Sequence, residues 1–268
     1  MEKSIVKSKV GIMRMNMLPG FNQYLKTVAE SFSRTPILSD TLNEMMQNIQ
    51  SAALKFAKAH AWFLRETSAR SKMASVQIIF TEPPAPELTD RLCENDVDIE
   101  DEVLKYYNAG DGAKLSDLIQ RCRNSEKISA YQELYDEIID TFSRQHFHLA
   151  CIGLFSIIDG VLADATGLLT NTAFIQRLDK IRERLDNKQE LLDEDLVLFS
   201  IYDGIERNQE VFFKGPRFDK EEPSTTVERN WLMHGRTHRQ YGKIDVIKIL
   251  LLLEGIIILA DAGEDSTT

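Results

Sequence analysis

The residue types best suited to chemistry gather in one short segment near the C-terminus, VERNWLMHGRTHRQYGK, which spans residues 227–243. Arg229 and Asn230 open a predicted short helix there, and His234 followed by Gly235 closes it, because glycine commonly ends helices. An imidazole titrates near neutrality and can exchange protons, whereas a planar guanidinium can donate two parallel hydrogen bonds to a phosphate. The segment therefore combines a proton-transfer group with an anion-binding group.

The spacing of these residues limits how they can meet. At about 100° per residue, Asn230 and His234 are four residues apart and share one face of a helix. Arg229 is five residues from His234, so the two side chains point about 140° apart on an ideal helix. A long guanidinium can span this offset, but the spacing alone does not bring the two groups into contact. The alternative interpretation is structural, with a helix-capping histidine and a salt-bridged arginine.

The run R-N-x-x-x-H from Arg229 to His234, followed by glycine, resembles the Rx4–6H motif of HEPN ribonucleases. The resemblance extends upstream to HFHLACIGLFSIIDGVLAD, in which Asp159 lies on a long apolar helix, and downstream to the apolar helix Ile244–Ala260. It covers roughly residues 99–262 and implies an all-α, HEPN-like helical bundle.

What the resemblance implies is an endoribonuclease that needs neither a metal nor another cofactor. In the family, the 2′-hydroxyl of RNA attacks the adjacent phosphorus and leaves a 2′,3′-cyclic phosphate and a 5′-hydroxyl. The motifs of two subunits face each other, which implies a homodimer with Arg229, Asn230 and His234 in one shared catalytic cleft. Histidine suits the proton transfers, and arginine suits the negatively charged oxygens around phosphorus, while Asn230 would orient the histidine or the phosphate. The C-terminal end of the short helix favours protonated His234.

Other residues near the motif have weaker signals. Arg236, His238 and Arg239 are candidates for binding RNA phosphates, and a solvated loop is the alternative. Asp159 needs a partner if it is buried, and contact with Arg229 would serve either structure or catalysis. Some HEPN toxins carry a tyrosine two residues after the histidine, where this chain has Arg236, and this departure counts against pairing with the nucleotidyltransferases that modify that tyrosine.

Several other kinds of site are disfavoured by the sequence. His146 and His148, with Asp159 or Asp164, lack the i, i+4 histidine pair or HExxH pattern of common metal sites, so no metal site is predicted. The sequence also lacks a Walker loop, a dinucleotide-binding fingerprint and a GxSxG elbow. These absences leave the Arg229–His234 segment as the main candidate.

Composition and charge limit the kinds of function and the cellular location that fit this chain. The 268 residues include 32 basic and 42 acidic side chains, for a formal net charge of −10, which argues against sequence-blind wrapping of nucleic acid over a broad surface. Three cysteines without a CxxC pair fit a reducing cytoplasm. The basic N-terminus lacks the apolar core of a signal peptide, and the most apolar stretch, Ile244–Ala260, is short for a bilayer span and contains charged residues. We therefore expect a cytoplasmic protein without a membrane segment.

The pattern along the chain predicts an all-α protein in two parts. Residues 1–82 form a mostly helical region of unassigned role, with one long helix from Asp40 and a stretch at 75–80 that fits either a strand or a helix end. A Pro-rich linker is predicted over residues 83–98, and a helical bundle over residues 99–268. Within the bundle we expect a turn at NAGDGAK, a long apolar helix ending near Gly167, and a last apolar helix after Gly242.

Two other functions remain open alongside the endoribonuclease, which would be a toxin or an anti-phage defence effector. One is a HEPN-fold module that dimerises or binds partners without catalysis, which the acidic net charge favours. The other is a helical scaffold in which Arg229 and His234 are structural. In the nuclease interpretation, the N-terminal region regulates activity or recruits a partner, such as an antitoxin protein.

Overall fold

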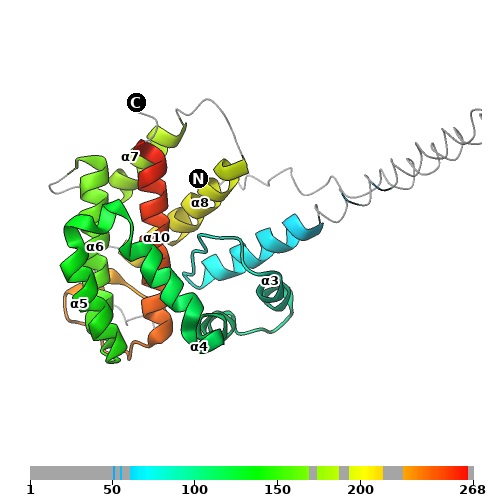
Figure 1. Ribbon diagram of the computed structural model, residues 1–268, viewed down its shortest axis with the longest axis horizontal. Helices are drawn as coiled ribbons and strands as arrows, with labels where there is room; N and C mark the ends of the chain where they lie inside the picture. Colours follow the sequence, from blue (N-terminus) through cyan, green and yellow to red (C-terminus); the bar gives the residue numbers. More distant parts are fainter. Residues whose placement is uncertain are drawn as a thin grey trace, which may run out of the picture. The chain divides into compact units, whose positions relative to one another are not determined.

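The computed structural model describes residues 51, 55, 61–168, 174–186, 193–213 and 226–264. The chain divides into two compact units, residues 1–63 and 64–268, and the motif belongs to the second. All regular structure in the described residues is helical, without any strand (Figure 1), and the predicted all-α class is confirmed. The long helix predicted from Asp40 lies largely outside the described residues.

The second unit begins with a helical stretch over residues 64–75. The labelled helices that follow are α3 (Pro86–Cys93), α4 (Ile99–Arg123), the 3-10 helix η2 (Glu126–Tyr131), α5 (Gln132–Ser143), α6 (Phe147–Thr166), α7 (Phe174–Asp186), α8 (Asp193–Phe213), α9 (Arg229–Met233) and α10 (Lys243–Glu264). The turn predicted at NAGDGAK is confirmed inside α4, where Ala109 to Gly112 leave the helical conformation. The predicted end of the long apolar helix is also confirmed, at a left-handed Gly167.

The structure differs from the predicted linker over residues 83–98. Pro86 is the first residue of α3, a position that suits proline because an N–H there has no partner within the helix. Leu88 and Leu92 of α3 are buried, so this short helix is part of the core. The division between the compact units falls earlier, after Phe63. At 75–80, where a strand or a helix end was expected, a helix ends and buried non-helical residues follow.

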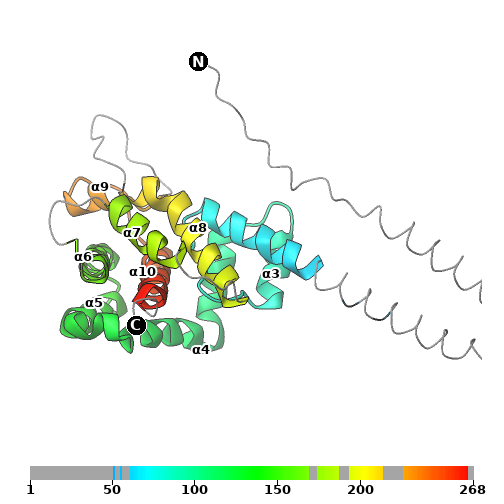
Figure 2. The ribbon, with the colours of Figure 1, turned by 90° about the horizontal axis from the view of Figure 1, so that it is seen from above.

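The central element of the second unit is α10, which packs against α4, α6, α7 and α8 (Figures 1 and 2). Every residue from Asp245 to Ile257 is buried, including Lys248 and Glu254. Burying a charge is unfavourable unless it is paired. Each of the three charged residues on this stretch of α10 has a partner on a different part of the chain.

Two of these partners come from α4. Lys248 Nζ lies 2.7 Å from a carboxylate oxygen of Glu100. Arg121 Nε lies 2.6 Å from Glu254 Oε1, and Thr81 Oγ1 donates to the other oxygen of the same carboxylate. These contacts tie α4 to α10 at both ends of α4 and thereby fix how the two helices lie against each other.

The apolar helix α6 lies at the edge of the unit, with α10 on its inner side (Figure 2). A Cβ on Gly160 would lie 2.6 Å from the Tyr131 ring, and one on Gly153 would overlap Ile138, so glycine allows α5 and η2 to approach α6 closely. Of the helices within the described residues, α6 has the length and hydropathy of a membrane span, but 56% of its most apolar window is buried inside the protein. We therefore interpret α6 as a core helix with one exposed side.

The pair between Lys248 and Glu100 gives an asymmetric prediction about stability. Lys248 is fully buried, whereas the Glu100 side chain is 33% exposed. Glu100→Ala leaves a buried ammonium without a partner and should lower the free energy of unfolding by about 3 kcal/mol or more. Lys248→Met removes the buried charge and leaves Glu100 in reach of water, so its effect should be under about 1.5 kcal/mol. Urea unfolding followed by circular dichroism measures both, and equal losses would contradict the prediction.

Candidate active site

The motif is carried by α9, a helix of five residues that packs against α6 and α8. Its Trp231 and Leu232 side chains are buried and attach it to the core. After the helix, Gly235 lies at φ +62°, and the N–H groups of Gly235 and Arg236 donate to the carbonyls of Leu232 and Trp231 at 3.1 and 3.0 Å. This pair of bonds is a Schellman motif, which favours glycine because it has no Cβ. The predicted helix end at Gly235 is confirmed.

An ion pair with Asp159 on α6 holds the Arg229 guanidinium, through Nη2 and Oδ2. The predicted contact between these two residues is therefore confirmed. Arg229 Nη1 also donates to Asn230 Oδ1 at 3.4 Å, and the buried Nε has no hydrogen-bond partner among the described residues. The pair is only partly shielded from water, since the two side chains are 27% and 32% exposed. The carboxylate thus orients the guanidinium without covering all of its donors.

A second arginine, which the sequence analysis did not select, contacts α6 at the same residue, Asp159. Arg177 on α7 is buried, and its Nη1 donates to the backbone carbonyl of Asp159 at 3.2 Å. Its Nε donates to the carbonyl of Leu168 at 3.1 Å, just beyond the end of α6. Two guanidiniums therefore converge on Asp159, one on its side chain and one on its backbone. The sequence contains no signal for this, because an arginine on an amphipathic helix is ordinarily solvated.

The histidine of the motif, His234, is the C-cap residue of α9. The His234 N–H donates to the Asn230 carbonyl at 3.1 Å, so the two residues lie one helical turn apart as expected. The His234 side chain is exposed. The structure thus brings Arg229, Asn230 and Asp159 into contact and places the imidazole at the solvent-facing end of the same short helix.

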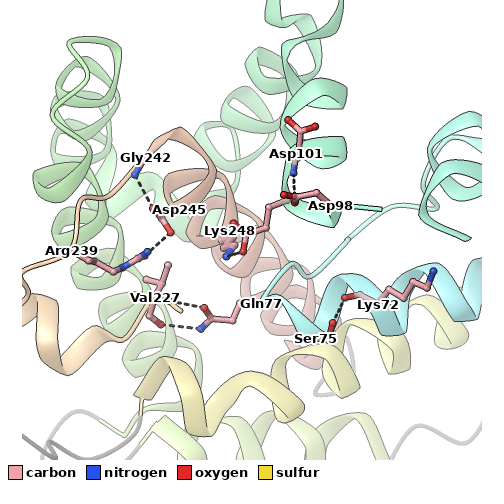
Figure 3. Close-up of polar contacts among 11 residues, drawn as sticks. Lys72, Ser75, Gln77, Asp98, Asp101, Val227, Arg239, Gly242, Asp245 and Lys248 are labelled. Carbon is pink, nitrogen blue, oxygen red and sulfur yellow. Dashed lines mark hydrogen bonds and ion pairs between the residues drawn. The ribbon is translucent and has the colours of Figure 1, made fainter. Parts of the chain in front are cut away.

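The segment that contains α9 is anchored at both ends by buried polar side chains (Figure 3). At its start, the side-chain amide of Gln77 makes two hydrogen bonds to the backbone of Val227. At its end, the Asp245 carboxylate accepts from Arg239 Nη2 at 2.6 Å and from the Gly242 N–H at 2.8 Å. These anchors fix the position of α9 against α6 although the helix itself is short.

The three predicted phosphate-binding residues have different surroundings. Arg236 and His238 are exposed and follow directly after the motif. The Arg239 guanidinium is partly buried, pairs with Asp245, and lies 4.0 Å from the centre of the Tyr241 ring. Because Arg239 already has an anionic partner in the core, its contacts support a structural role. Its role in binding phosphate stays a prediction, as do those of Arg236 and His238.

In the part of the chain that the structure describes, no cluster of metal-ligating side chains is found, and two of the three cysteines are buried. No group of three or more His, Cys, Asp or Glu side chains gathers among these residues. His148 Nε2 lies 3.1 Å from the Arg239 carbonyl, which adds a further contact at the end of the motif segment. Cys122 and Cys151 are buried, and burial raises the pKa of both thiols far above neutrality, so neither is a thiolate nucleophile.

A cavity of about 920 Å³ lies elsewhere in the second unit, between α4, η2 and α10. The ion pair of Arg121 with Glu254 forms part of its lining. None of the predicted site residues lines this cavity. This cavity and the motif therefore lie at different places in the second unit.

The ion pair of Arg229 and Asp159 should be measurable as a coupling between the two side chains. In a double-mutant cycle with Arg229→Ala and Asp159→Ala, we expect a coupling free energy of about 1 kcal/mol, between the values typical of exposed and buried pairs. The pair of Arg65 and Asp90, whose side chains are 63% and 60% exposed, is the control and should couple by only a few tenths of a kcal/mol, roughly. Equal coupling in the two cycles, measured by urea unfolding, would mean that Asp159 does not hold Arg229 in solution.

Comparisons with known proteins give no relative for this chain. No protein-family model, no curated protein and no solved structure matches the sequence or its fold. The assignment of a function therefore depends on the geometry of the motif and on the pattern of residues that carries it.

Proposed function

We propose that this protein is a metal-independent endoribonuclease of the HEPN type, with an active site that is completed by a second copy of the chain. The observation that carries the proposal is the arrangement on α9. One short helix presents an exposed imidazole, His234, at its end and an oriented guanidinium, Arg229, at its start. The all-α fold and the order of an apolar α6, a motif helix and an apolar α10 agree with the resemblance.

The proposed chemistry needs only these side chains and the RNA. The 2′-oxygen forms a bond to the adjacent phosphorus and loses its proton, while the bond from phosphorus to the 5′-oxygen breaks and that oxygen gains a proton. His234 is suited to one of these proton transfers because an imidazole exchanges protons near neutral pH. Arg229 would donate hydrogen bonds to the phosphate oxygens as their negative charge increases. Asn230 would help to orient the phosphate or the imidazole.

The ion pair with Asp159 is compatible with this role of Arg229. A guanidinium has five N–H donors in a fixed plane, and Asp159 accepts from only one edge. The Arg229 side chain is 27% exposed, so part of the guanidinium is within reach of a phosphate oxygen while Asp159 holds the other part. Asp159 would act as a positioning residue, which reduces the freedom of a long side chain before substrate binds.

The exposed side of α6 supports the second copy as the partner. Residues at every third or fourth position along it, which is the spacing of helix–helix contacts, are Leu149, Ile152, Ser156, Asp159 and Ala163. Leu149 is 61% exposed, and Met233 at the end of α9 is 38% exposed. If α6 packs against its copy along this stripe, Asp159 and its bound Arg229 come close to the symmetry-related pair.

A second candidate function is a dimerisation or protein-binding module without catalysis. The observation that favours it is again the ion pair, because a carboxylate neutralises the guanidinium that would bind phosphate. The formal net charge of −10 points in the same direction. This candidate retains the α6 surface and requires no cleavage activity.

The biological role follows only from the proposal. A ribonuclease of this kind would act in the cytoplasm, which the three free cysteines fit. It would serve as a toxin or a defence effector, with the N-terminal region or a separate antitoxin protein controlling its activity.

RNA cleavage by the full chain in the presence of EDTA tests the proposal. We expect wild type to cleave single-stranded RNA and leave a 2′,3′-cyclic phosphate, and to spare the same oligonucleotide with a 2′-deoxy sugar at the cleavage position. Arg229→Ala and His234→Ala should each lower the rate by about 10²-fold or more.

The matched control for this assay is the double variant Arg144→Ala/His146→Ala. It removes an exposed arginine and an exposed histidine at the turn between α5 and α6, outside the motif, and should cleave like wild type. Cleavage that survives both motif substitutions, or that disappears with EDTA, would reject the proposed site. An inactive wild type that still dimerises would support the binding module instead.

The dimer surface has its own test. Leu149→Glu places a charge on the most exposed apolar side chain named for the proposed contact, so we expect a monomer where wild type is a dimer at micromolar concentration, as measured by light scattering after size exclusion. Phe199→Glu on α8 is the control, because Phe199 is 68% exposed and lies on another helix. A Leu149→Glu protein that stays dimeric would exclude this face of α6 as the interface.

A further inference from the structure

Gln77 has a backbone conformation that local structure would assign to glycine. It lies at φ +64°, in the left-handed region. The helix over residues 64–75 ends there in a Schellman motif, in which the Gln77 and Ile78 N–H groups donate to the carbonyls of Ala74 and Met73 at 3.1 and 2.9 Å. Glycine is usual at this position because a Cβ is strained there. A glutamine that accepts this strain is expected to compensate through its side chain.

The side chain of Gln77 binds both backbone groups of one residue 150 positions away. Its Nε2 donates to the Val227 carbonyl at 2.9 Å, and the Val227 N–H donates to its Oε1 at 2.6 Å (Figure 3). Gln77 is 1% exposed and Val227 is fully buried. A primary amide matches the donor and acceptor of a backbone in this way, and the shielding from water makes loss of either bond unfavourable.

The Gln77 side of this contact is held firmly. Arg70, on the same helix, donates from Nη1 to the Phe80 carbonyl at 2.8 Å and from Nη2 to the Glu82 carbonyl at 3.2 Å. The chain on both sides of Gln77 is therefore fixed to its own helix. The Val227 side leads directly into α9, since Glu228 is its N-cap and Arg229 its first residue.

Gln145 provides an internal comparison. It lies at φ +63° in the same kind of turn at the end of α5, where the N–H groups of Gln145 and His146 donate to the carbonyls of Phe142 and Thr141. Its side chain, however, is exposed. The two glutamines therefore share a strained turn and differ in whether the side chain is buried against a distant backbone.

We propose that Gln77 is a positioning residue that sets the location of Arg229 by clamping the backbone of Val227, two residues upstream. The clamp itself stands on the contacts above, and only its effect on RNA cleavage rests on the proposed function. Because one end of the clamp belongs to the helix over residues 64–75, a ligand or partner that moves this helix would also move the motif.

Hydrogen exchange measured by mass spectrometry on the full chain tests the clamp. Gln77→Gly keeps the turn and relieves its strain but removes both side-chain bonds, so amides of residues 227–235 should exchange about tenfold faster. Gln145→Gly relieves the same strain without removing a clamp, so exchange in residues 227–235 should be unchanged and the thermal midpoint should rise. Gln77→Met, which keeps the length of the side chain and loses both hydrogen bonds, should speed exchange in the same peptide.

A spectroscopic readout separates positioning from general stability. We expect the Hε1–Cε1 signal of the His234 ring to shift in Gln77→Gly, in which the His146 signal is the internal reference, and to stay in place in Gln145→Gly. In an active enzyme, kcat should fall while KM changes little. An inactive wild type would reject the proposed function. Hydrogen exchange and the His234 ring signal would then still test whether Gln77 positions the motif.

Two outcomes would overturn the inference. One is unchanged exchange over residues 227–235 in folded Gln77→Gly. The other is faster exchange spread evenly over the second unit, which would make Gln77 an ordinary stability residue. If Gln77→Gly does not fold, the same two criteria apply to Gln77→Met.

Discussion

The arrangement of the second unit depends on the pairing of charges along a buried helix. α10 carries Asp245, Lys248 and Glu254 in a stretch where every residue is buried. An unpaired charge in that environment is strongly unfavourable, so each needs a partner at a defined place. Glu254 and Lys248 bind α4, and Asp245 binds Arg239 at the end of the motif segment. The hydrophobic core supplies most of the stability, whereas these pairs specify which elements lie against α10.

The same requirement operates at the candidate active site, but with partial exposure to water. Asp159 on α6 orients Arg229, and Arg177 binds the backbone at the same residue. Two guanidiniums thus contact one aspartate in a protein with a formal net charge of −10. A pre-oriented arginine beside an exposed His234 suits phosphate chemistry, and a neutralised arginine suits a structural contact. Both interpretations use the same geometry. They differ in whether a phosphate binds the Arg229 N–H groups that are not bound to Asp159.

The position of a short helix such as α9 has to be fixed by its surroundings. Five residues form too few internal hydrogen bonds to be stable alone. Trp231 and Leu232 attach α9 to the core, and Gln77 and Asp245 fix the chain on either side. The motif can therefore be both solvent-facing and well ordered. This combination is what a catalytic or a recognition site requires.

Much of the secondary structure is determined by local sequence. Apolar periodicity and helix-ending glycines were enough to predict the all-α class, the break inside α4, the end of α6 at Gly167 and the end of α9 at Gly235. The contact of Arg229 with Asp159 could be anticipated because a carboxylate on an apolar helix needs a partner. The run of prolines was interpreted as a linker, whereas Pro86 starts the buried helix α3. Only the tertiary structure decided that Gln77 binds Val227, that Arg177 binds at Asp159 and that Arg239 is engaged by Asp245. These contacts join polar groups that solvent would satisfy in the unfolded chain, and partners on separate elements are selected only when folding removes the water around them.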